Sequence, residues 1–207
     1  MTDAADAVID LYRRHARAWT RARVAQAMVE EGWLERFRRL LRVGGTVLDI
    51  GCGAGVPVAR HFVSKGHPVL GIDSSPAMIA LFEDNLPGMA AQLADMRSLR
   101  LDRGFDGLIA WDSFFHLSPA DQRSMFAVFR DHAEPLAPLM FTSGPAHGEA
   151  IGTLEGEPLY HASLDEAEYR ALLDHHGFDV VRFVAEDPGC GGRSVWLARR
   201  RQARRPQ

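Results

Sequence analysis

The chain has 207 residues, 46% of them hydrophobic and 25% charged, which is the composition of an ordinary soluble globular domain. Its two cysteines, Cys52 and Cys190, exclude a disulfide framework and a CxxC metal pair, and no apolar run reaches the roughly 18 residues that a membrane span needs. The formal net charge is -3 although five arginines stand in the last nine residues, so the rest of the chain is acidic and a nucleic-acid groove is not expected.

Residues 1–44 are expected to form an N-terminal helical cap. The opening sequence MTDAADAVID carries acids where a signal peptide carries basic residues, which together with the few cysteines predicts a cytoplasmic protein. Tyr12 and Trp19 fall at helical spacing within a pattern that predicts a helix over residues 4–42, with a break at Gly32.

From residue 46 onward, short runs rich in apolar and β-branched residues alternate with helical patterns. Strands are predicted at 46–50, 68–73, 90–95, 105–111 and 138–143, and helices at 56–65, 76–85 and 119–132. This alternation is typical of βαβ units and predicts a parallel sheet with helices on both faces.

The last third of the chain has a different pattern. Ser163 followed by Glu166 is a capping-box pattern, which predicts a helix that ends near Gly177. The runs FDVVRFVAE and SVWLARR are predicted strands joined only by a glycine-rich loop, and such strands pair antiparallel. We therefore expect one domain over residues 45–200, followed by a basic tail over 201–207 that either contacts phosphate or is a solvated C-terminus.

A glycine-rich turn follows the first predicted strand, in the stretch VLDIGCGAG. Such a turn lets the backbone approach a ligand closely, at the edge where open α/β sheets bind ligands. The dinucleotide fingerprint GxGxxG needs a glycine where Val56 stands, whereas the glycines here are Gly51, Gly53 and Gly55. Asp49 would repel a pyrophosphate but suits a ligand that carries an ammonium and a sulfonium. Both observations favour S-adenosylmethionine over NAD.

Two further aspartates end predicted strands. Asp73, at the end of the second strand, is placed to accept hydrogen bonds from ribose hydroxyls. Asp95 ends the third strand and can accept from an adenine amino group while the neighbouring Met96 packs on the ring. The segments VLDIGCGAG, GIDSSPAMI, ADMRSL and FDGLIAWDSFFHL resemble, in this order, the motifs of class I S-adenosylmethionine-dependent methyltransferases of the small-molecule type.

The resemblance implies both a fold and a cofactor site. The fold is a Rossmann-like doubly wound α/β sheet of seven strands in the order 3-2-1-4-5-7-6, with strand 7 antiparallel, plus the N-terminal helical cap. The glycine turn is expected to pass under the methionyl part of the cofactor, and Trp111 to begin the segment beside the methyl group. The expected cofactor-binding residues are Tyr12, Trp19, Arg23, Asp49, Gly51, Gly53, Gly55, Asp73, Ser74, Met78, Asp95, Met96 and Trp111.

The N-terminal helices have two interpretations. Tyr12 and Trp19 share one helix face and Arg23 follows one turn later, so this face can close over the cofactor as a lid, with Arg23 paired to the methionyl carboxylate. Alternatively, the aromatic residues dock the helix onto the sheet. The two interpretations do not exclude each other.

Two segments can line the space beside the methyl group, residues 111–117 and 144–163, and the second is longer than a plain connection. Methyl transfer is an in-line displacement, so the protein must mainly align the nucleophile, exclude water and remove a proton where there is one. His116 is expected to be the general base, or else to be packed and satisfied beside Phe115.

Other polar residues of these segments are candidates as well. His147 with Glu149 forms a second catalytic pair and His161 beside Tyr160 a third, unless each only anchors a loop. Asp112, with the glutamates of segment 144–163, makes the site attractive to an amine, unless these acids are simply solvated. The expected substrate-binding residues are Asp112, Phe115, His116, Tyr160 and His161.

No metal site is expected. The sequence has no HxxxH or HExxH pattern, and the adjacent His175 and His176 near a helix end point in different directions.

The sequence thus predicts an enzyme that transfers a methyl group from S-adenosylmethionine to an oxygen or nitrogen of a small-molecule acceptor, with no nucleic-acid or membrane partner. The fourth predicted strand is followed by WDSF and not by an NPPY-like segment, so the chain only weakly resembles the DNA and protein amino-methyltransferases that carry such a segment. Three alternatives are an RNA methyltransferase assisted by the arginine tail, a non-catalytic adenosylmethionine-binding sensor or partner subunit, and a nicotinamide oxidoreductase.

Overall fold

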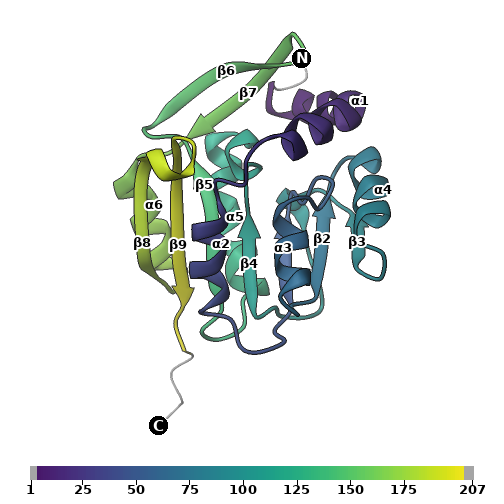
Figure 1. Cartoon of the computed structure of the whole chain (residues 1–207). Helices are drawn as coiled ribbons and strands as arrows, with labels where there is room; N and C mark the ends of the chain where they lie inside the picture. Colours follow the sequence, from purple (N-terminus) through teal and green to yellow (C-terminus); the bar gives the residue numbers. More distant parts are fainter. Residues whose placement is uncertain (1–3, 203–207) are drawn as a thin grey trace.

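The computed structural model describes residues 4–202 and contains a seven-stranded sheet with helices on both faces (Figure 1). The strands of this sheet are β1 (Val47–Ile50), β2 (Val69–Asp73), β3 (Ala90–Leu93), β4 (Gly107–Ala110), β5 (Pro138–Ser143), β8 (Phe178–Asp187) and β9 (Arg193–Arg200). Their order is β3-β2-β1-β4-β5-β9-β8, and only the two pairs that involve β9 are antiparallel. Because β9 is the seventh strand of this sheet in chain order, the predicted order and the predicted antiparallel strand are confirmed.

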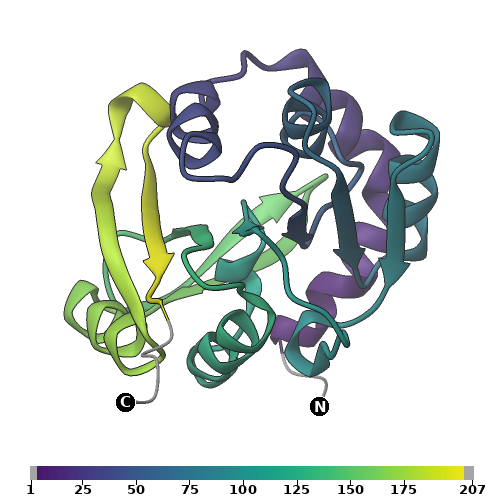
Figure 2. The ribbon, with the colours of Figure 1, turned by 90° about the horizontal axis from the view of Figure 1, so that it is seen from below.

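Helices pack on both faces of the sheet (Figure 2). These helices are α2 (Glu31–Arg38), α3 (Val58–Ser64), α4 (Pro76–Asn85), α5 (Pro119–His132) and α6 (Glu166–His175), while α1 (Ala4–Ala25) lies over the carboxyl ends of the strands (Figure 1). The 3₁₀ turns are η1 (Met96–Ser98), η2 (Phe114–His116) and η3 (Pro188–Cys190). Phe126 of α5 and Tyr169 of α6 are buried in one core cluster, and Phe37 of α2 and Phe62 of α3 in the other. No helix within residues 4–202 is long and apolar enough to cross a membrane.

The break in the N-terminal helical segment lies before Gly32, not at it. α1 ends at Ala25 and α2 begins at Glu31, so Gly32 stands inside α2, where nothing lies within 4 Å of the position of a Cβ. Trp33 and Phe37 are almost completely buried in the core, and this burial stabilises the first turns of α2 despite the glycine. The prediction of a break at Gly32 is therefore wrong by several residues.

Residues 144–163, expected to be a long loop, contain an antiparallel hairpin that lies beside α1 (Figure 1). Strand β6 (Gly148–Leu154) pairs with β7 (Glu157–Ser163) across a two-residue turn. The turn residues Glu155 and Gly156 have φ values of 51° and 82°, which suit a primed turn whose twist matches that of hairpin strands. The segment is long because it is a second, two-stranded sheet.

Helix α6 is capped by Asp165 instead of Ser163. The Asp165 carboxylate accepts a hydrogen bond of 2.7 Å from the backbone N–H of Glu168. Ser163 is still part of β7, and its hydroxyl donates to the backbone carbonyl of Leu164. The predicted helix is present, but the capping-box residue was wrong because the hairpin extends up to residue 163.

Part of the arginine-rich C-terminal end is folded. Arg199 and Arg200 belong to β9, and Arg201 forms ion pairs with Asp174 and Asp179. Residues 203–207 of the predicted basic tail lie outside the described residues. The domain boundaries at residues 44 and 200 remain a prediction.

Candidate active site

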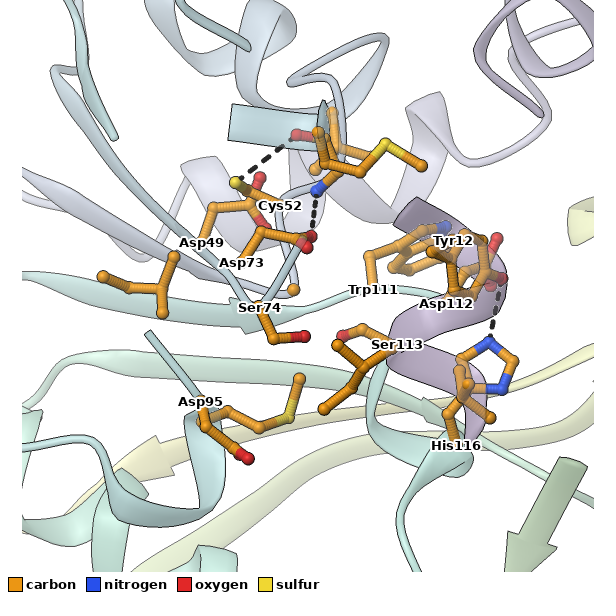
Figure 3. A pocket seen from close by; sticks show the side chains of 18 of the residues that line it. Tyr12, Asp49, Cys52, Asp73, Ser74, Asp95, Trp111, Asp112, Ser113 and His116 are labelled. Carbon is orange, nitrogen blue, oxygen red and sulfur yellow. Dashed lines mark hydrogen bonds between the residues drawn. The ribbon is translucent and has the colours of Figure 1, made fainter. Parts of the chain in front are cut away.

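A cavity lies between α1 and the carboxyl ends of the central parallel strands, and we call it the inner cavity (Figure 3). It is lined by all but one of the predicted cofactor residues: Tyr12, Trp19, Arg23, Asp49, Gly51, Gly53, Asp73, Ser74, Met78, Asp95, Met96 and Trp111. Gly55 is the exception. A Cβ at Gly55 would lie 2.7 Å from Phe82 and from Leu86, so this glycine lets the turn pack on α4.

Helix α1 forms the roof of the inner cavity and is anchored by apolar contacts at two places along its length. Near its start, Val8 packs in an apolar cluster with Leu159 of β7. Further along, Ala16 packs in another cluster with Met78 of α4. The helix is therefore both docked by apolar contacts and placed over the cavity, as the two interpretations of the sequence expected, while its opening as a lid remains a prediction.

The glycine turn needs its first glycine for close packing. Gly51 has a φ of 75°, and a Cβ there would lie 2.3 Å from the Cβ of Ser113. The Ser113 hydroxyl donates a hydrogen bond of 2.7 Å to the carbonyl of Ile50, which holds the segment after β4 against the turn. Any side chain at residue 51 would separate these two segments and fill part of the cavity floor.

Asp73 fixes the turn and keeps part of its carboxylate toward the inner cavity. Its Oδ2 accepts a hydrogen bond of 2.8 Å from the Gly53 backbone N–H, and its Oδ1 accepts one of 2.9 Å from that of Ser75. Burial raises the pKa of Asp73, while these backbone hydrogen bonds act in the opposite direction. A carboxylate has about four acceptor positions, so further hydroxyl donors can bind to it.

Asp49 is a buried carboxyl group whose pairing is incomplete among the described residues. It is 2% exposed, and its Oδ2 has no hydrogen-bond partner among the described residues. Burial, and secondly the negative charge of Asp73, raise the pKa of Asp49 to about 7. Because a buried charge is costly unless it is paired, a cation in the inner cavity would stabilise the ionised form of this group.

Asp95 is held by an arginine that sequence reasoning did not single out. Arg97 donates to Asp95 from Nε at 3.0 Å and from Nη2 at 2.6 Å, and its Nη1 donates to Asp6 of α1 at 2.6 Å. Burial raises the pKa of Asp95, but the hydrogen bonds from Arg97 outweigh burial and leave the pKa lowered. The expected adenine-end carboxylate is therefore ionised and tied to the roof helix. The pair could have been predicted from the sequence, because Asp95 and Arg97 are only two positions apart.

Arg23 is paired within the protein. Its guanidinium forms a buried ion pair with Glu30, which precedes α2 and is completely buried. Arg23 is itself 7% exposed and lines the inner cavity, so the donors that Glu30 does not use remain available there. Sequence reasoning predicted Arg23 but missed Glu30, because nothing in the sequence distinguishes a buried glutamate from the exposed one that follows it.

His116 connects three separate parts of the chain. Its Nδ1 lies 2.8 Å from the carbonyl oxygen of Tyr160, and its Nε2 lies 3.0 Å from the hydroxyl of Tyr12. A carbonyl oxygen only accepts, so Nδ1 carries the proton and Nε2 accepts from Tyr12. Burial lowers the pKa of His116 to about 4, so the ring is neutral at pH 7. Figure 3 shows this pair beside Asp112, on the other side of the cavity from Asp49, Asp73 and Asp95.

A second, more open cavity adjoins the first, and we call it the outer cavity. The two share Tyr12, Trp19, Arg23, Asp112 and His116 in their walls. Phe115 and His161 line only the outer cavity, and their rings are 5.2 Å apart. Tyr160 lines neither cavity; its side chain is buried against α1, and its carbonyl holds His116.

Asp112 is not a free carboxylate. Arg193 of β9 donates to it from Nε at 2.9 Å and from Nη2 at 2.8 Å. Both residues line the outer cavity. The idea that Asp112 attracts an amine therefore needs correction: its charge is already balanced by a residue 81 positions away, which no local pattern reveals.

His147 and Glu149 are not part of the site. Both are exposed at the start of the hairpin and line neither cavity. Of the other hairpin acids, Glu155 is at the exposed turn, and Glu157 pairs with Arg14 and His15 of α1. The first four residues of β6, apolar ones included, are all exposed, so this end of the strand projects into solvent, whereas the sequence analysis took the segment for a loop over the cavity.

Within residues 4–202, no group of three or more His, Cys, Asp or Glu side chains is arranged to hold a metal ion.

Comparison of the sequence with protein families matches residues 47–135 to the family model described as a methyltransferase domain. Among curated proteins, an uncharacterized methyltransferase of Alkaliphilus oremlandii is 25% identical over 136 residues, 63% of this chain and 62% of that protein. The dTDP-3-amino-3,4,6-trideoxy-alpha-D-glucopyranose N,N-dimethyltransferase of Streptomyces venezuelae is 26% identical over 158 residues, 72% of this chain and 64% of that protein. The chain thus spans less than two thirds of the length of these relatives.

Solved structures share the fold at lower sequence identity. An amino pentose methyltransferase from Micromonospora echinaspora with S-adenosylmethionine bound has a TM-score of 0.71 at 21% identity, covering 88% of this chain and 95% of that one. The 1,6-didemethyltoxoflavin-N1-methyltransferase of Burkholderia thailandensis with S-adenosylhomocysteine has a TM-score of 0.72 at 18% identity, covering 96% of this chain and 87% of that one.

Proposed function

We propose that this chain, which carries a methyltransferase domain over residues 47–135, transfers a methyl group from S-adenosylmethionine to an oxygen or nitrogen of a small molecule. The observation that carries the proposal is the inner cavity itself. Asp49 presents a buried carboxyl group there with one oxygen unpartnered among the described residues, and it lies beside the glycine turn, where a Cβ at Gly51 would collide with Ser113. This chemistry suits a ligand with a cationic methionyl part and no pyrophosphate.

The remaining residues of the inner cavity fit the other parts of this cofactor. Asp73 accepts hydrogen bonds from the ribose hydroxyls, and Asp95 with Met96 flanks the adenine. Arg23 offers its unused donors to the methionyl carboxylate, and Asp49 faces the ammonium. When bound, the cofactor supplies a methyl group on a sulfonium, which is activated for displacement by a nucleophile.

The acceptor is assigned to the outer cavity. Tyr12, Asp112 and His116 stand in the walls of both cavities, so an acceptor atom near them adjoins the inner cavity. Phe115 and His161 offer ring faces to the rest of the acceptor. The chain's contribution is to align the acceptor and to exclude water, which together can supply a large part of the rate enhancement.

His116 is the proton acceptor in this proposal. Its Nε2 carries no proton and faces the junction of the cavities, where the Tyr12 hydroxyl must turn aside for an acceptor hydroxyl to donate. A base with a pKa of about 4 accepts a proton readily from a methylated hydroxyl group, which is a strong acid, but not from a methylated aliphatic amine. An amine acceptor would instead enter uncharged and keep its proton until release.

Two observations bear on the choice of acceptor. The similar proteins from Streptomyces venezuelae and Micromonospora echinaspora are named as methyltransferases of amino sugars, which supports a nitrogen acceptor. The neutral, buried His116 supports an oxygen acceptor. Within the described part of the tail nothing favours the RNA alternative, because Arg199 and Arg200 are strand residues and Arg201 is ion-paired.

The test is transfer of labelled methyl groups from S-adenosylmethionine to a panel of phenols, alcohols, amino sugars and heteroaromatic amines. We expect product from at least one class, and loss of product in Asp73→Ala. Binding of S-adenosylhomocysteine without methylation of any acceptor would contradict catalysis and favour the adenosylmethionine-binding sensor.

A further inference from the structure

The carboxyl groups of the inner cavity differ in how they are paired. Asp73 accepts from two backbone N–H groups, and Asp95 accepts from Arg97. Asp49, on the adjoining strand β1, has an oxygen without any partner among the described residues. Asp49 is therefore the carboxyl group of this site that a bound ligand could supply with a partner.

The groups around Asp49 do not compensate its charge. Asp73 on β2 is negative and raises the pKa of Asp49, and the thiol of Cys52 in the glycine turn is buried with its own pKa raised. From α1, Arg23 is paired with Glu30, and the Tyr12 hydroxyl donates to His116. No cation of the described residues offsets burial and Asp73, so the pKa of Asp49 stands at about 7.

The segment after β4 supplies no free charge either. Trp111 has a neutral indole, and the carboxylate of Asp112 is held by Arg193. Near neutral pH the free protein is therefore a mixture in which a proton partly neutralises Asp49.

From this geometry we propose that binding of adenosylmethionine or adenosylhomocysteine expels a proton from Asp49, whose place is taken by the ligand's ammonium group. The inference rests on the proposed function, since it needs this ligand in the inner cavity. The proton leaves the Asp49 carboxyl for solvent, the ammonium keeps its own protons, and no covalent bond of the ligand changes. A carboxylate and an ammonium paired in a buried site stabilise each other, while the protonated carboxyl cannot pair in this way.

The sign of the pH dependence follows. Below pH 7 the ligand must displace a proton, so its affinity falls about tenfold for each pH unit. Above pH 7 Asp49 is already ionised, and its contribution to the affinity becomes independent of pH. The site is thus sensitive to pH in the physiological range through one residue.

The test is titration calorimetry of the full chain with adenosylhomocysteine at pH 6.0, in phosphate, MES and imidazole buffers. The slope of the binding enthalpy against the buffer's ionisation enthalpy counts the protons released. We expect about 0.9 proton per ligand, because a group with a pKa of about 7 is about nine-tenths protonated at this pH. Methylthioadenosine, which lacks the ammonium, should release none.

Two variants separate Asp49 from its neighbours. Asp49→Asn should abolish proton release and flatten the affinity between pH 6 and 8. Asp95→Asn is the matched control in the same cavity, and it should keep the wild-type proton count because Arg97 holds Asp95 ionised already.

Three results would overturn the inference, and they can be told apart. Adenosylhomocysteine binding with no buffer dependence would contradict proton release and leave the proposed function standing. Equal proton release with methylthioadenosine would contradict the role of the ammonium. Absence of any adenosylhomocysteine binding would overturn the proposed function as well. The comparison of the two ligands uses the wild-type protein, so it holds even if Asp49→Asn does not fold.

Discussion

The inner and outer cavities are built in different ways. Most of the inner cavity comes from consecutive strand ends between Asp49 and Arg97, roofed by α1. The outer cavity combines α1, the segment after β4, the hairpin and the start of β9 at Arg193. The difference indicates that the proposed cofactor site is set by local strand–turn chemistry, whereas the proposed acceptor site depends on contacts between segments far apart in the chain.

The largest expected effect is a loss of stability from a substitution in the floor of the inner cavity. Gly51→Ala places a Cβ 2.3 Å from that of Ser113 at a φ of 75°, so we expect roughly 2–5 kcal/mol of lost stability from backbone strain and overlap. Urea unfolding measures this. Gly53→Ala is the matched control: its φ of 52° is also positive, but its nearest neighbour lies at 3.6 Å, so the loss should be smaller. Equal losses would mean that close packing at residue 51 has no special role.

The second prediction concerns the junction between the cavities. His116→Gln should lower turnover about 10²-fold, at the low end for general-base catalysis because the pKa of His116 is far from neutrality. The affinity for adenosylhomocysteine should change much less than turnover. Methyl-transfer kinetics and calorimetry on the same protein measure both. An unaltered rate would mean that His116 is a packed residue and not the general base.

The third prediction tests whether the two cavities bind different ligands. Asp73→Ala removes the acceptor for the ribose and for the Gly53 and Ser75 backbone N–H groups, so adenosylhomocysteine affinity should fall roughly 10- to 100-fold. His161→Ala, at a residue that lines only the outer cavity, should raise the KM of the acceptor and leave cofactor affinity unchanged. If both variants changed cofactor affinity alike, the two cavities would not be separate sites.

The smallest expected effect concerns the contact between the hairpin and the roof helix. Hydrogen bonds from Arg14, and secondly from His15, lower the pKa of Glu157 to about 2, from its ordinary value of 4.5. Since the folded-state pKa is the lower one, this stabilisation is present above pH 4.5 and is lost as pH falls toward 2. Glu157→Gln should therefore lower Tm slightly at pH 7.

The pH dependence of Tm tests this last prediction. The Tm difference between the wild type and Glu157→Gln should narrow between pH 5 and pH 3. Glu155→Gln, at the exposed turn of the same hairpin, should show no such trend. A difference that stays constant with pH would mean that the charge of Glu157 does not hold the hairpin to α1.

The inner cavity could be predicted from the sequence for a physical reason. Parallel strands bring their carboxyl ends to one edge, so Asp49, Asp73 and Asp95 meet whenever their strands are recognised. Only details were missed, such as Arg97 at Asp95 and the packing role of Gly55.

The outer cavity could not be predicted in the same way. Asp112 was taken as free because its partner Arg193 is brought near only by the antiparallel strand β9. His147 and Glu149 were placed over the site because the segment was read as a loop, whereas it forms a hairpin whose first residues are exposed to solvent. Such errors arise wherever a residue's role depends on tertiary pairing and not on its own sequence neighbours.

The most direct test of the central claim is calorimetric titration of the wild-type protein with adenosylhomocysteine and, separately, with NAD. The inner cavity as described should bind adenosylhomocysteine in the micromolar range and NAD not at all, because the ionised form of Asp49 pairs with an ammonium and would repel a pyrophosphate. Binding of NAD without binding of adenosylhomocysteine would contradict the account and require the site to be reassigned to a dinucleotide.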